Sequence, residues 1–400
     1  MSKGKDQKPH IGIFGRKNNG KSSFINTITN QDVAIVSNKA GTTTDPVKKS
    51  IEIFGVGPAI IIDTAGIDDK GELGNKRVEK TQQVIKIIDL AILIISRNNF
   101  NNYEKKLIGK FNNYSIPYFI IHNKSDIETI NKETINKIND YEKTEIINFS
   151  TIEPNNIDDV LELIKKTIPE TAYQKSSLLK NLISKDDIIM LVTPIDSETP
   201  EGRLILPEVM AIRNILDNNC TAIVLQDNEI ENFLQKTKIK PNLVITDSQV
   251  FNKVKNLIPE NIPLTSFSIV LAHYKGDFKN YLKGTPKLSD LKDGDRVLIF
   301  ESCTHQVNCE DIGRIKIPNW IKKFTGKELS FEVVTGLNKL PRDIKEYAIV
   351  IQCGGCVLTR KQIINRLKPA VDAEIPVSNY GMTISYVNGI YKRVIAPFIK

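Results

Sequence analysis

The sequence contains no long hydrophobic run and few residues that bind metals or form disulfides, with five cysteines and four histidines in 400 residues. Its apolar runs end well before the roughly 20 residues that a membrane-spanning helix requires, so we expect no membrane span. Residues 1–10 are polar and contain lysine without an apolar core, so we expect no signal peptide. These features predict a cytoplasmic protein, whose cysteines are free thiols or metal ligands more often than disulfides.

The sequence also lacks a basic cluster with interleaved aromatic residues, because its lysines are spread along the chain. The formal net charge of +8 is modest for this length, and the composition (40% hydrophobic, 26% charged) is ordinary for a soluble globular protein. We therefore expect neither a nucleic-acid partner nor a membrane partner. A length of 400 residues predicts two or three domains.

A glycine-containing loop with Walker A spacing lies near the N-terminus, at residues 15–22 (GRKNNGKS). It follows the apolar segment 11–14 and precedes a segment typical of a helix, which is the context that this motif needs. The N–H groups of such a loop and of the helix N-terminus surround phosphate oxygens. Lys21 is expected to contact the β- and γ-phosphates, and Ser22 to bind Mg²⁺. The candidate phosphate-binding residues are Gly15, Asn18, Asn19, Gly20, Lys21, Ser22 and Ser23.

Further short motifs predict how Mg²⁺ and the γ-phosphate are held. Asp63 follows the apolar run 60–62 and is expected to hold Mg²⁺ through water, while the N–H of Gly66 is expected to meet the γ-phosphate. The segment 41–45 lies in the interval of the first switch, and Thr43 within it is a predicted Mg²⁺ ligand. Each motif alone also fits an ordinary turn, but their order and spacing together predict a GTPase.

The motif NKSD, which follows an apolar strand, predicts selection of guanine. Its aspartate, Asp126, is placed to accept hydrogen bonds from N1 and N2 of guanine, which adenine does not offer in that geometry. The asparagine and lysine of the motif are expected to buttress the loop and cover the ring face. A later Ser-Thr pair lies where a backbone N–H usually meets guanine O6. The candidate base-binding residues are Asn123, Lys124, Asp126, Ser150 and Thr151.

This set of motifs resembles the TrmE/Era branch of the translation-factor-type GTPases. Ile67 is apolar where Ras-like enzymes place a water-orienting glutamine. Asn18 matches the residue that helps to hold K⁺ in potassium-stimulated members of this branch, and the backbone of residues 38–40 would complete the site. The resemblance implies that K⁺ supplies the charge that an arginine finger supplies elsewhere. The candidate catalytic residues are Lys21, Asn18, Thr43 and Gly66. No catalytic base is assigned, and Glu72 and Glu79 are both candidates in a polar stretch.

The apolar pattern divides the chain into three α/β segments, 1–173, 174–272 and 273–400. We predict an α/β protein in which a P-loop GTPase domain is followed by two smaller α/β domains with mainly parallel sheets. The second segment carries no catalytic motif and is predicted to self-associate, because edges of small sheets pair readily with a symmetry mate. The strands expected after the first segment are 188–192, 222–225, 243–246, 265–271, 296–300, 331–334 and 347–351.

Four of the five cysteines lie in the third segment, where Cys303-Thr304-His305 follows one expected strand and Cys353-Gly354-Gly355-Cys356 follows another. In a parallel sheet both groups leave the same carboxyl edge, where open α/β sheets bind ligands. Three interpretations stay open: a dithiol redox motif, a zinc site of Cys₃His type, and an iron–sulfur cluster with three thiolates and a variable fourth ligand. Cys220 and Cys309 are expected to be spectator thiols, and His10, His122 and His273 lack the spacing of metal ligands.

A TrmE/Era-type GTPase joined to a C-x-H…C-x-x-C segment resembles one family, the FeFe-hydrogenase maturation GTPases (HydF). The resemblance covers the whole chain and includes the segments 194–198 and 202–205. The family pattern has histidine directly before the C-x-x-C pair, where this sequence has Gln352. That departure leaves the fourth iron ligand open among His305, a carboxylate such as Asp196, water and an incoming precursor.

The resemblance implies GTPase, dimerisation and cluster-binding domains in a homodimer, with a 4Fe–4S cluster held by Cys303, Cys353 and Cys356. It also implies a scaffold or carrier that accepts a two-iron precursor, made with two radical-SAM maturases, and delivers it to the apo-hydrogenase. GTP hydrolysis would then be a switch. Two alternatives are an RNA-modification or ribosome-assembly GTPase, for which no KH loop or RRM aromatics are found, and a GTPase with a structural zinc or redox-sensing domain.

Overall fold

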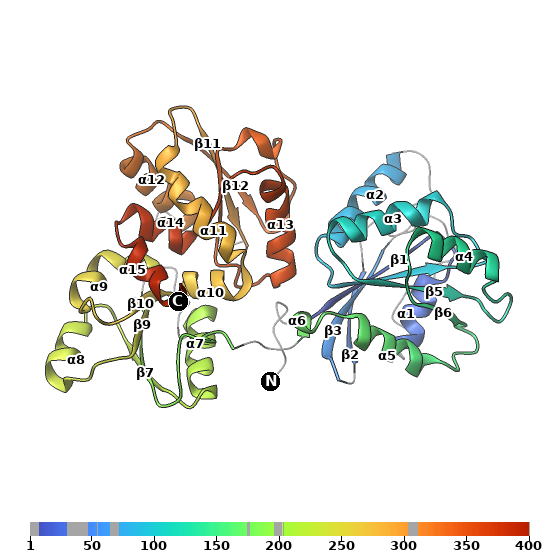
Figure 1. Cartoon of the computed structure of the whole chain (residues 1–400), viewed down its shortest axis with the longest axis horizontal. Helices are drawn as coiled ribbons and strands as arrows, with labels where there is room; N and C mark the ends of the chain where they lie inside the picture. The colour runs from blue at the N-terminus through green and yellow to red at the C-terminus, as the bar shows by residue number, and fades with distance from the viewer. Residues whose placement is uncertain are drawn as a thin grey trace. The chain divides into compact units, whose positions relative to one another are not determined.

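The computed structural model describes residues 8–29, 47–53, 55–64, 72–173, 177–195, 202, 204–302 and 311–399. The chain forms two compact units, Met1–Lys175 and Ser176–Lys400, and each is described by itself (Figure 1). Of the predicted site residues, five lie outside the described residues: Thr43, Gly66, Asp196, Cys303 and His305.

The first unit is a six-stranded sheet of order β2-β3-β1-β4-β5-β6, in which β2 is antiparallel to β3 and the other neighbours are parallel. Its strands are β1 (His10–Gly15), β2 (Val47–Ile53), β3 (Gly57–Asp63), β4 (Leu90–Ile95), β5 (Tyr118–Asn123) and β6 (Ile146–Phe149). Its helices are α1 (Lys21–Thr29), α2 (Glu72–Ile85), α3 (Asn102–Asn113), α4 (Lys132–Tyr141), α5 (Ile157–Thr167) and α6 (Glu170–Tyr173).

Helices cover both faces of this sheet, because its central strands are apolar on both sides. Ile11 and Ile13 of β1 pack in one core with α1 and α5, whereas Phe14 packs in a second core with α2, α3 and α4. Such a doubly wound sheet binds ligands at the carboxyl ends of its strands. The loop after β1 therefore lies at the binding edge.

The second unit contains two four-stranded sheets whose neighbouring strands are all parallel. The first sheet is formed by β7 (Ile188–Val192), β8 (Thr221–Leu225), β9 (Leu243–Thr246) and β10 (Leu264–Ser266), and the second by β11 (Arg296–Glu301), β12 (Ser330–Thr335), β13 (Ile349–Gln352) and β14 (Val377–Asn379). The strand orders, β10-β9-β7-β8 and β14-β13-β11-β12, are the same. The predicted fold class is thus confirmed: a P-loop GTPase fold followed by smaller α/β layers with parallel sheets.

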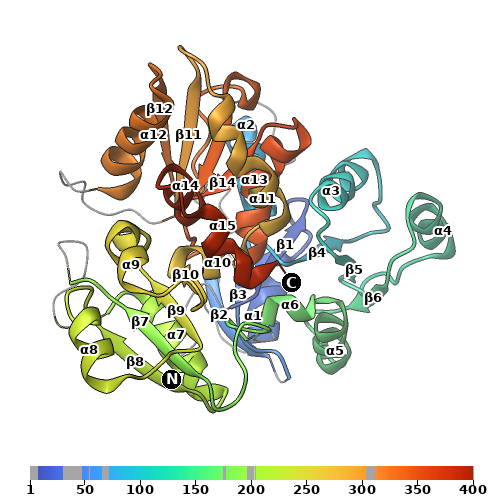
Figure 2. The same ribbon diagram turned by 60° about the vertical axis from the view of Figure 1, so that its left-hand side comes forward.

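Helices cover both sheets of the second unit (Figure 2). They are α7 (Leu206–Asp217), α8 (Ile230–Thr237), α9 (Phe251–Leu257), α10 (Phe267–Lys275), α11 (Phe278–Gly284), α12 (Ile317–Thr325), α13 (Arg360–Asp372), α14 (Tyr380–Val387) and α15 (Tyr391–Ile395). Short helical turns are η2 (Ser248–Val250), η3 (Thr285–Asp290), η4 (Ile312–Lys316), η5 (Ile344–Glu346) and η6 (Ala396–Phe398).

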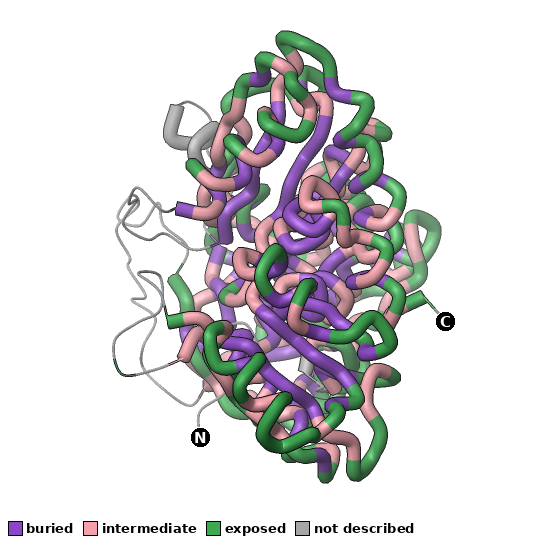
Figure 3. Tube along the Cα trace, turned by 90° about the vertical axis from the view of Figure 1, so that its left-hand side faces the viewer, coloured by how far each residue is buried: buried purple, intermediate pink, exposed green. Residues whose placement is uncertain are grey.

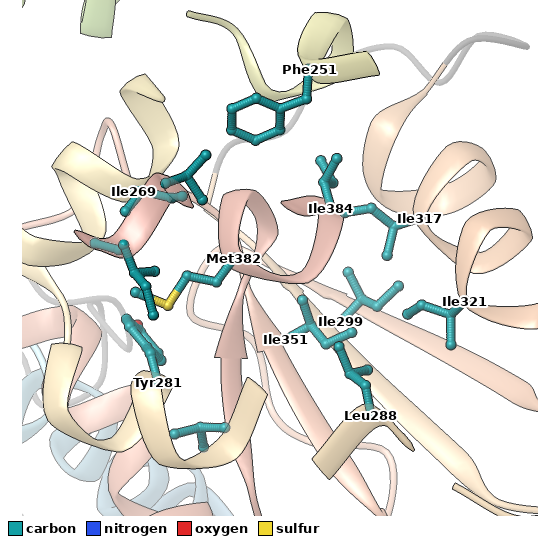
Figure 4. Packing of buried hydrophobic residues seen from close by; sticks show 14 of the residues in the cluster. Phe251, Ile269, Tyr281, Leu288, Ile299, Ile317, Ile321, Ile351, Met382 and Ile384 are labelled. Atoms are coloured by element: carbon teal, nitrogen blue, oxygen red, sulfur yellow. The ribbon is translucent and has the colours of Figure 1, made fainter. Parts of the chain in front are cut away.

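One hydrophobic core joins the two sheets. Phe251 of α9 and Ile269 of α10 belong to the same buried cluster as Ile299 of β11, Ile351 of β13 and Met382 of α14 (Figure 4). Figure 3 shows that most strands are buried, while exposed residues lie mainly on helices and loops. Within the described part of the chain, no helix is both long enough and apolar enough to span a bilayer.

The strand predicted at 265–271 is wrong for most of its length. The strand β10 ends at Ser266, whose hydroxyl accepts a hydrogen bond from Ile269 N (3.3 Å) and so begins the helix α10. A short apolar run fits either element by periodicity, and an N-cap serine decides in favour of the helix. The three-residue strand β14 was not predicted at all.

Candidate functional site

The phosphate loop connects β1 to α1 and has the backbone that its sequence predicts. Gly20 has a φ of +85°, and a Cβ at this position would lie 2.3 Å from Asn123 Nδ2. Only glycine fits such a conformation and so close an approach. Asn18, the predicted K⁺ residue, also has a positive φ of +63°, which asparagine tolerates better than most residues.

Lys21 is directed into this loop. Its ammonium donates to Gly15 O (2.9 Å) and Arg16 O (2.8 Å), and the residue is 8% exposed. A cation held against the loop is placed to meet the phosphates that the loop surrounds. Ser23, the last of the predicted phosphate-binding residues, is half-buried at the start of α1.

Ser22 and Asp63 meet at the predicted Mg²⁺ position. Ser22 Oγ donates to Asp63 Oδ2 (2.8 Å), while Asp63 Oδ1 is buried without a hydrogen-bond partner among the described residues. Burial raises the pKa of the Asp63 carboxyl, although the Ser22 hydrogen bond and the charge of Lys21 oppose the shift. A hydroxyl and a desolvated carboxylate with a spare oxygen fit the oxygen ligand set of Mg²⁺.

The base-recognition motif is tied to the phosphate loop through Asn19. Asn123 Nδ2 donates to Asn19 O (2.9 Å), and the Asn19 side chain donates to Ile94 O (2.9 Å) and accepts from Ser96 Oγ (2.9 Å). Ser96 belongs to no motif, so nothing in the sequence pointed to it. The network fixes the distance between the two halves of the nucleotide site.

Ser150 holds the carboxylate that is expected to read guanine. Its hydroxyl donates to Asp126 Oδ1 (2.6 Å) and accepts from Ile152 N and Glu153 N (both 3.1 Å). Ser150 is buried and Asp126 is exposed, so the carboxylate is fixed from behind and open to a ligand in front. The two remaining residues of the predicted set, Lys124 and Thr151, lie in the same two loops and are half-buried.

A partly buried ion pair also holds the phosphate loop. Arg16 Nε and Nη2 donate to the two carboxylate oxygens of Glu104 (2.8 and 3.0 Å), and the Glu104 side chain is fully buried. The guanidinium also lies 5.1 Å from the centre of the Tyr103 ring. Glu104 is 88 positions from Arg16, so the pair could not be found from motif spacing.

The site residues of the switch regions lie outside the described residues, as do Ile67 and the backbone of 38–40. Of the two carboxylates considered as a base, Glu79 is exposed, and the side chain of Glu72 is likewise outside the described part.

The second candidate site is the loop 353–358, which follows β13 and is here called the cysteine loop. Cys353 N donates to Phe300 O (2.9 Å) of the neighbouring strand β11, so the loop begins at the carboxyl edge of the sheet. Cys353 and Cys356 are both half-buried. Gly355 between them has a φ of +70°, which lets the loop turn tightly.

Ser302 and Gln352 surround the sulfur of Cys353. Ser302 Oγ lies 2.8 Å from Cys353 Sγ, and Gln352 Nε2 lies 3.1 Å from Cys353 O and 3.5 Å from its sulfur. Gln352 is fully buried, and its Oε1 has no hydrogen-bond partner within the described structure. Ser302 directly precedes Cys303 in the sequence, and Cys303 itself lies outside the described residues.

One buried and one half-buried cation lie beside the cysteine loop. Lys275 of α10 is 4% exposed and donates to carbonyls of the loop. Arg366 of α13 donates to Glu301 O (2.8 Å) and Val334 O (2.6 Å) and stacks on Phe300. Burial lowers the pKa of the Arg366 guanidinium to about 10, and the nearby Cys353 opposes that shift.

Among residues 8–302 and 311–399, apart from the gaps named above, no group of three or more His, Cys, Asp or Glu side chains is placed to hold a metal ion. Cys303 and His305 fall in the gap between these ranges. The residues present nevertheless fit an iron–sulfur or zinc group, because one loop carries two soft sulfur donors. The side chain of Gln352, whose Oε1 has no partner within the described structure, lies against the sulfur of Cys353. The remaining cysteine that is described, Cys220, is buried and donates to Ser184 O (3.0 Å).

Comparison with protein-family models divides the chain into three consecutive matches. Residues 10–124 match the model of the 50S ribosome-binding GTPases. Residues 178–276 match the hydrogen maturase F dimerization domain, and residues 279–397 match the hydrogen maturase F tetramerization domain. The two hydrogen maturase F matches together cover more than half of the chain.

Curated relatives match less than half of this chain. The chain is 31% identical over 165 residues to GTPase Der of Wolinella succinogenes, covering 39% of this chain and 35% of that protein. It is 37% identical over 159 residues to the tRNA modification GTPase MnmE of Lactobacillus acidophilus, covering 38% of this chain and 33% of that protein. The match thus spans about a third of the length of either relative. Era of Aquifex aeolicus, solved with GDP and AlF₄⁻, matches 55% of this chain and 93% of its own, with 20% identity and a TM-score of 0.38.

Proposed function

The chain belongs to the hydrogen maturase F family, and from this premise we propose that it is a GTP-hydrolysing iron–sulfur scaffold or carrier in hydrogenase maturation. It would accept the two-iron precursor of the FeFe-hydrogenase active site and deliver it to the apo-hydrogenase. The observation that carries this proposal is the position of Cys353 and Cys356 at the carboxyl edge of the second small sheet, with Ser302 2.8 Å from the sulfur of Cys353. Cys303, the third proposed ligand, directly follows Ser302 in the sequence.

In the proposed cluster site, Cys303, Cys353 and Cys356 would hold a 4Fe–4S cluster and leave one iron for another ligand. His305, Asp196, water and the precursor itself are the candidates for that position. Gln352 stands where the family pattern has histidine, and its amide nitrogen faces the backbone and sulfur of Cys353. Three thiolates leave the exchangeable position that a carrier needs, whereas four would close the cluster.

In the proposed nucleotide site, Lys21 and the N–H groups of residues 15–23 would bind the phosphates of GTP. Ser22, Thr43 and Asp63 would hold Mg²⁺, and Gly66 would contact the γ-phosphate. Asn18 would hold K⁺, and its positive φ turns the loop at that point. Hydrolysis is then stimulated by potassium and acts as a switch for the scaffold.

We further propose a homodimer formed through the first small sheet. The strand β8 lies at the edge of that sheet, and its Val224 is 41% exposed. The neighbouring helix α7 exposes Val209 (48%) and Leu216 (58%). An apolar edge strand beside an apolar helix face suits pairing with a second copy, as the name of the matched model also suggests.

The proposed partners of the dimer are the two radical-SAM maturases and the apo-hydrogenase, in the cytoplasm. GTP would alter the contacts with a maturase, because the nucleotide site and the cysteine loop lie in different units of the chain. This part of the proposal is tested by measuring maturase binding and cluster transfer with GTP, with GDP and without nucleotide. Identical results in all three states would contradict it.

The scaffold role is tested by anaerobic reconstitution with iron and sulfide, followed by metal analysis and EPR of the reduced protein. We expect a 4Fe–4S signal in the wild type and its loss in Cys303→Ala. Cys220→Ala is the matched control, because its thiol bonds a carbonyl far from the cysteine loop in sequence. Tightly bound zinc with no reducible cluster would contradict the proposal and favour a structural or sensing domain.

A further inference from the structure

The strand β2 lies at the edge of the six-stranded sheet and carries a lysine on its core-facing side. Ile53 is buried in the core that contains α1 and α5, and Ile51 packs against that core. Lys49 lies on the same face, because every second side chain of a strand points the same way, and it is only 9% exposed. Ile61, its neighbour on β3, belongs to the same core. A lysine is almost never buried to this extent unless it has a partner.

The partner of Lys49 is an amide on the helix that follows the phosphate loop. The Lys49 ammonium donates to Asn26 Oδ1 of α1 (3.2 Å). Asn26 follows Ser22 by four residues, so the two side chains lie on one face of the helix, about 5.4 Å apart along its axis. Ser22 Oγ in turn donates to Asp63 Oδ2 (2.8 Å) at the predicted Mg²⁺ position. The ammonium is therefore held about one helical turn from the expected metal ligands.

The register of the sheet leads to the same place. Val47 lies opposite Asp63, and Lys49 comes two residues later on the same face of β2. Burial lowers the pKa of the Lys49 ammonium, and the nearby charge of Asp63 opposes that shift. Asp63 Oδ1 nevertheless has no hydrogen-bond partner among the described residues. Lys49 thus lies close enough to Asp63 to act on its charge, while its printed hydrogen bond goes to Asn26 and leaves that oxygen open.

A fixed positive charge at this position opposes the binding of a second cation. It repels Mg²⁺, and the repulsion is stronger in a partly buried site than in water, because the dielectric constant is lower and salt screens it less. In the metal-free form the same charge offsets part of the negative charge of Asp63. Lys49 therefore stabilises the metal-free form of the site relative to the Mg²⁺-bound form.

A simpler role for an inward lysine on an edge strand is to prevent pairing with another chain. That role needs charge on β2, which the exposed Lys48 next to it also supplies. It needs neither a hydrogen bond to α1 nor a position beside Asp63. The two roles therefore predict different results when the charge of Lys49 is removed.

We propose that Lys49 weakens Mg²⁺ binding at the nucleotide site and thereby speeds the release of GDP. In the proposed site, Mg²⁺ joins the phosphates to Ser22 and Asp63, so its departure loosens the nucleotide. This inference rests on the proposed nucleotide site and adds to it a residue that belongs to none of the nucleotide-binding motifs. Lys49 would set how readily the bound nucleotide is exchanged, without touching the base.

The decisive variant is Lys49→Gln, which keeps an N–H donor and removes the charge. The full chain is loaded with fluorescent mant-GDP, and its release is followed over a series of free Mg²⁺ concentrations. We expect the Mg²⁺ concentration that gives half-maximal slowing of release to be about tenfold lower in this variant. Lys49→Arg should keep the wild-type value. Lys48→Gln is the matched control, because it removes the same charge from the exposed neighbouring residue, and it should also keep that value.

Release in excess EDTA separates an effect on Mg²⁺ from an effect on the nucleotide itself. The wild type and Lys49→Gln should then release mant-GDP at the same rate. An unchanged Mg²⁺ dependence in Lys49→Gln, or an equal shift in Lys48→Gln, would overturn the inference and favour protection of the edge strand. Faster release from Lys49→Gln in EDTA would also overturn it, because the ammonium would then hold phosphate. If release from the wild type does not depend on Mg²⁺, the proposed nucleotide site itself fails, and the inference fails with it.

Discussion

Replacing Ser150 with alanine is expected to weaken GDP binding about tenfold, because the Ser150 hydroxyl fixes the carboxylate of Asp126. The Ser150 hydroxyl donates to Asp126 Oδ1 (2.6 Å). The Ser150 oxygen also accepts hydrogen bonds from two N–H groups of its own loop. A hydrogen bond to a charged group contributes about 1.5–3 kcal/mol. Because Asp126 is exposed, water replaces part of the lost hydrogen-bond energy. We therefore expect the binding free energy to weaken by about 1.4 kcal/mol, which is a factor of ten in Kd.

The assay is calorimetric titration with GDP, which is not hydrolysed and so reports binding alone. Ser150→Thr keeps the hydroxyl and should bind within about twofold of the wild type. Thr151→Ala is the matched control, because the neighbouring residue is expected to use only its backbone. A Kd for Ser150→Ala equal to that of the wild type, in protein with an unchanged melting temperature, would refute the positioning role of this hydroxyl.

Three further predictions concern separate parts of the molecule. Lys21→Ala should abolish GTP hydrolysis, measured by phosphate release, while the cluster signal stays, and Cys353→Ala should do the reverse. Glu104→Gln should lower the free energy of unfolding by about 2–3 kcal/mol, measured with urea, because a charged acceptor of Arg16 is lost; an unchanged midpoint would argue against this role of the ion pair. Burial lowers the pKa of His10 from 6.5 to about 4, so the unfolded chain binds a proton that the folded chain does not. Stability should therefore fall by about 3 kcal/mol from pH 6.5 to 4, and His10→Gln should remove that component from urea melts.

The sequence was most informative where chemistry restricts both residue type and spacing. A phosphate loop needs glycine at positions such as 20, and the structure shows why, since Asn123 Nδ2 leaves no space for a Cβ there. The strands predicted at 188–192 and 243–246 coincide with β7 and β9, because mostly apolar runs of this length suit a parallel sheet with both faces covered. The fold class followed from such segments.

Other features depend on contacts between residues far apart in the chain, which spacing does not reveal. The ion pair of Arg16 with Glu104 and the contact of Lys275 with Leu358 join different elements, and no functional motif of the sequence contains Glu104 or Lys275. The run 265–271 was assigned to a strand because short apolar segments are ambiguous. The predicted boundary at 272/273 falls inside α10, and the domain limits and metal ligands stay predictions.

The duplicated fold of the second unit also bears on how this chain reaches its native state. The two sheets of this unit have the same strand order, and β9 in the first sheet holds the place that β13 holds in the second. Both strands can therefore compete for the position beside β7. Strand exchange of this kind is a characteristic error of repeated and multidomain chains. During synthesis, β7 to β10 emerge before β11 exists, and the first sheet forms without a rival. During refolding from denaturant, all eight strands are present at the same time. The order of synthesis therefore favours the correct strand pairing, which the strand order alone does not specify.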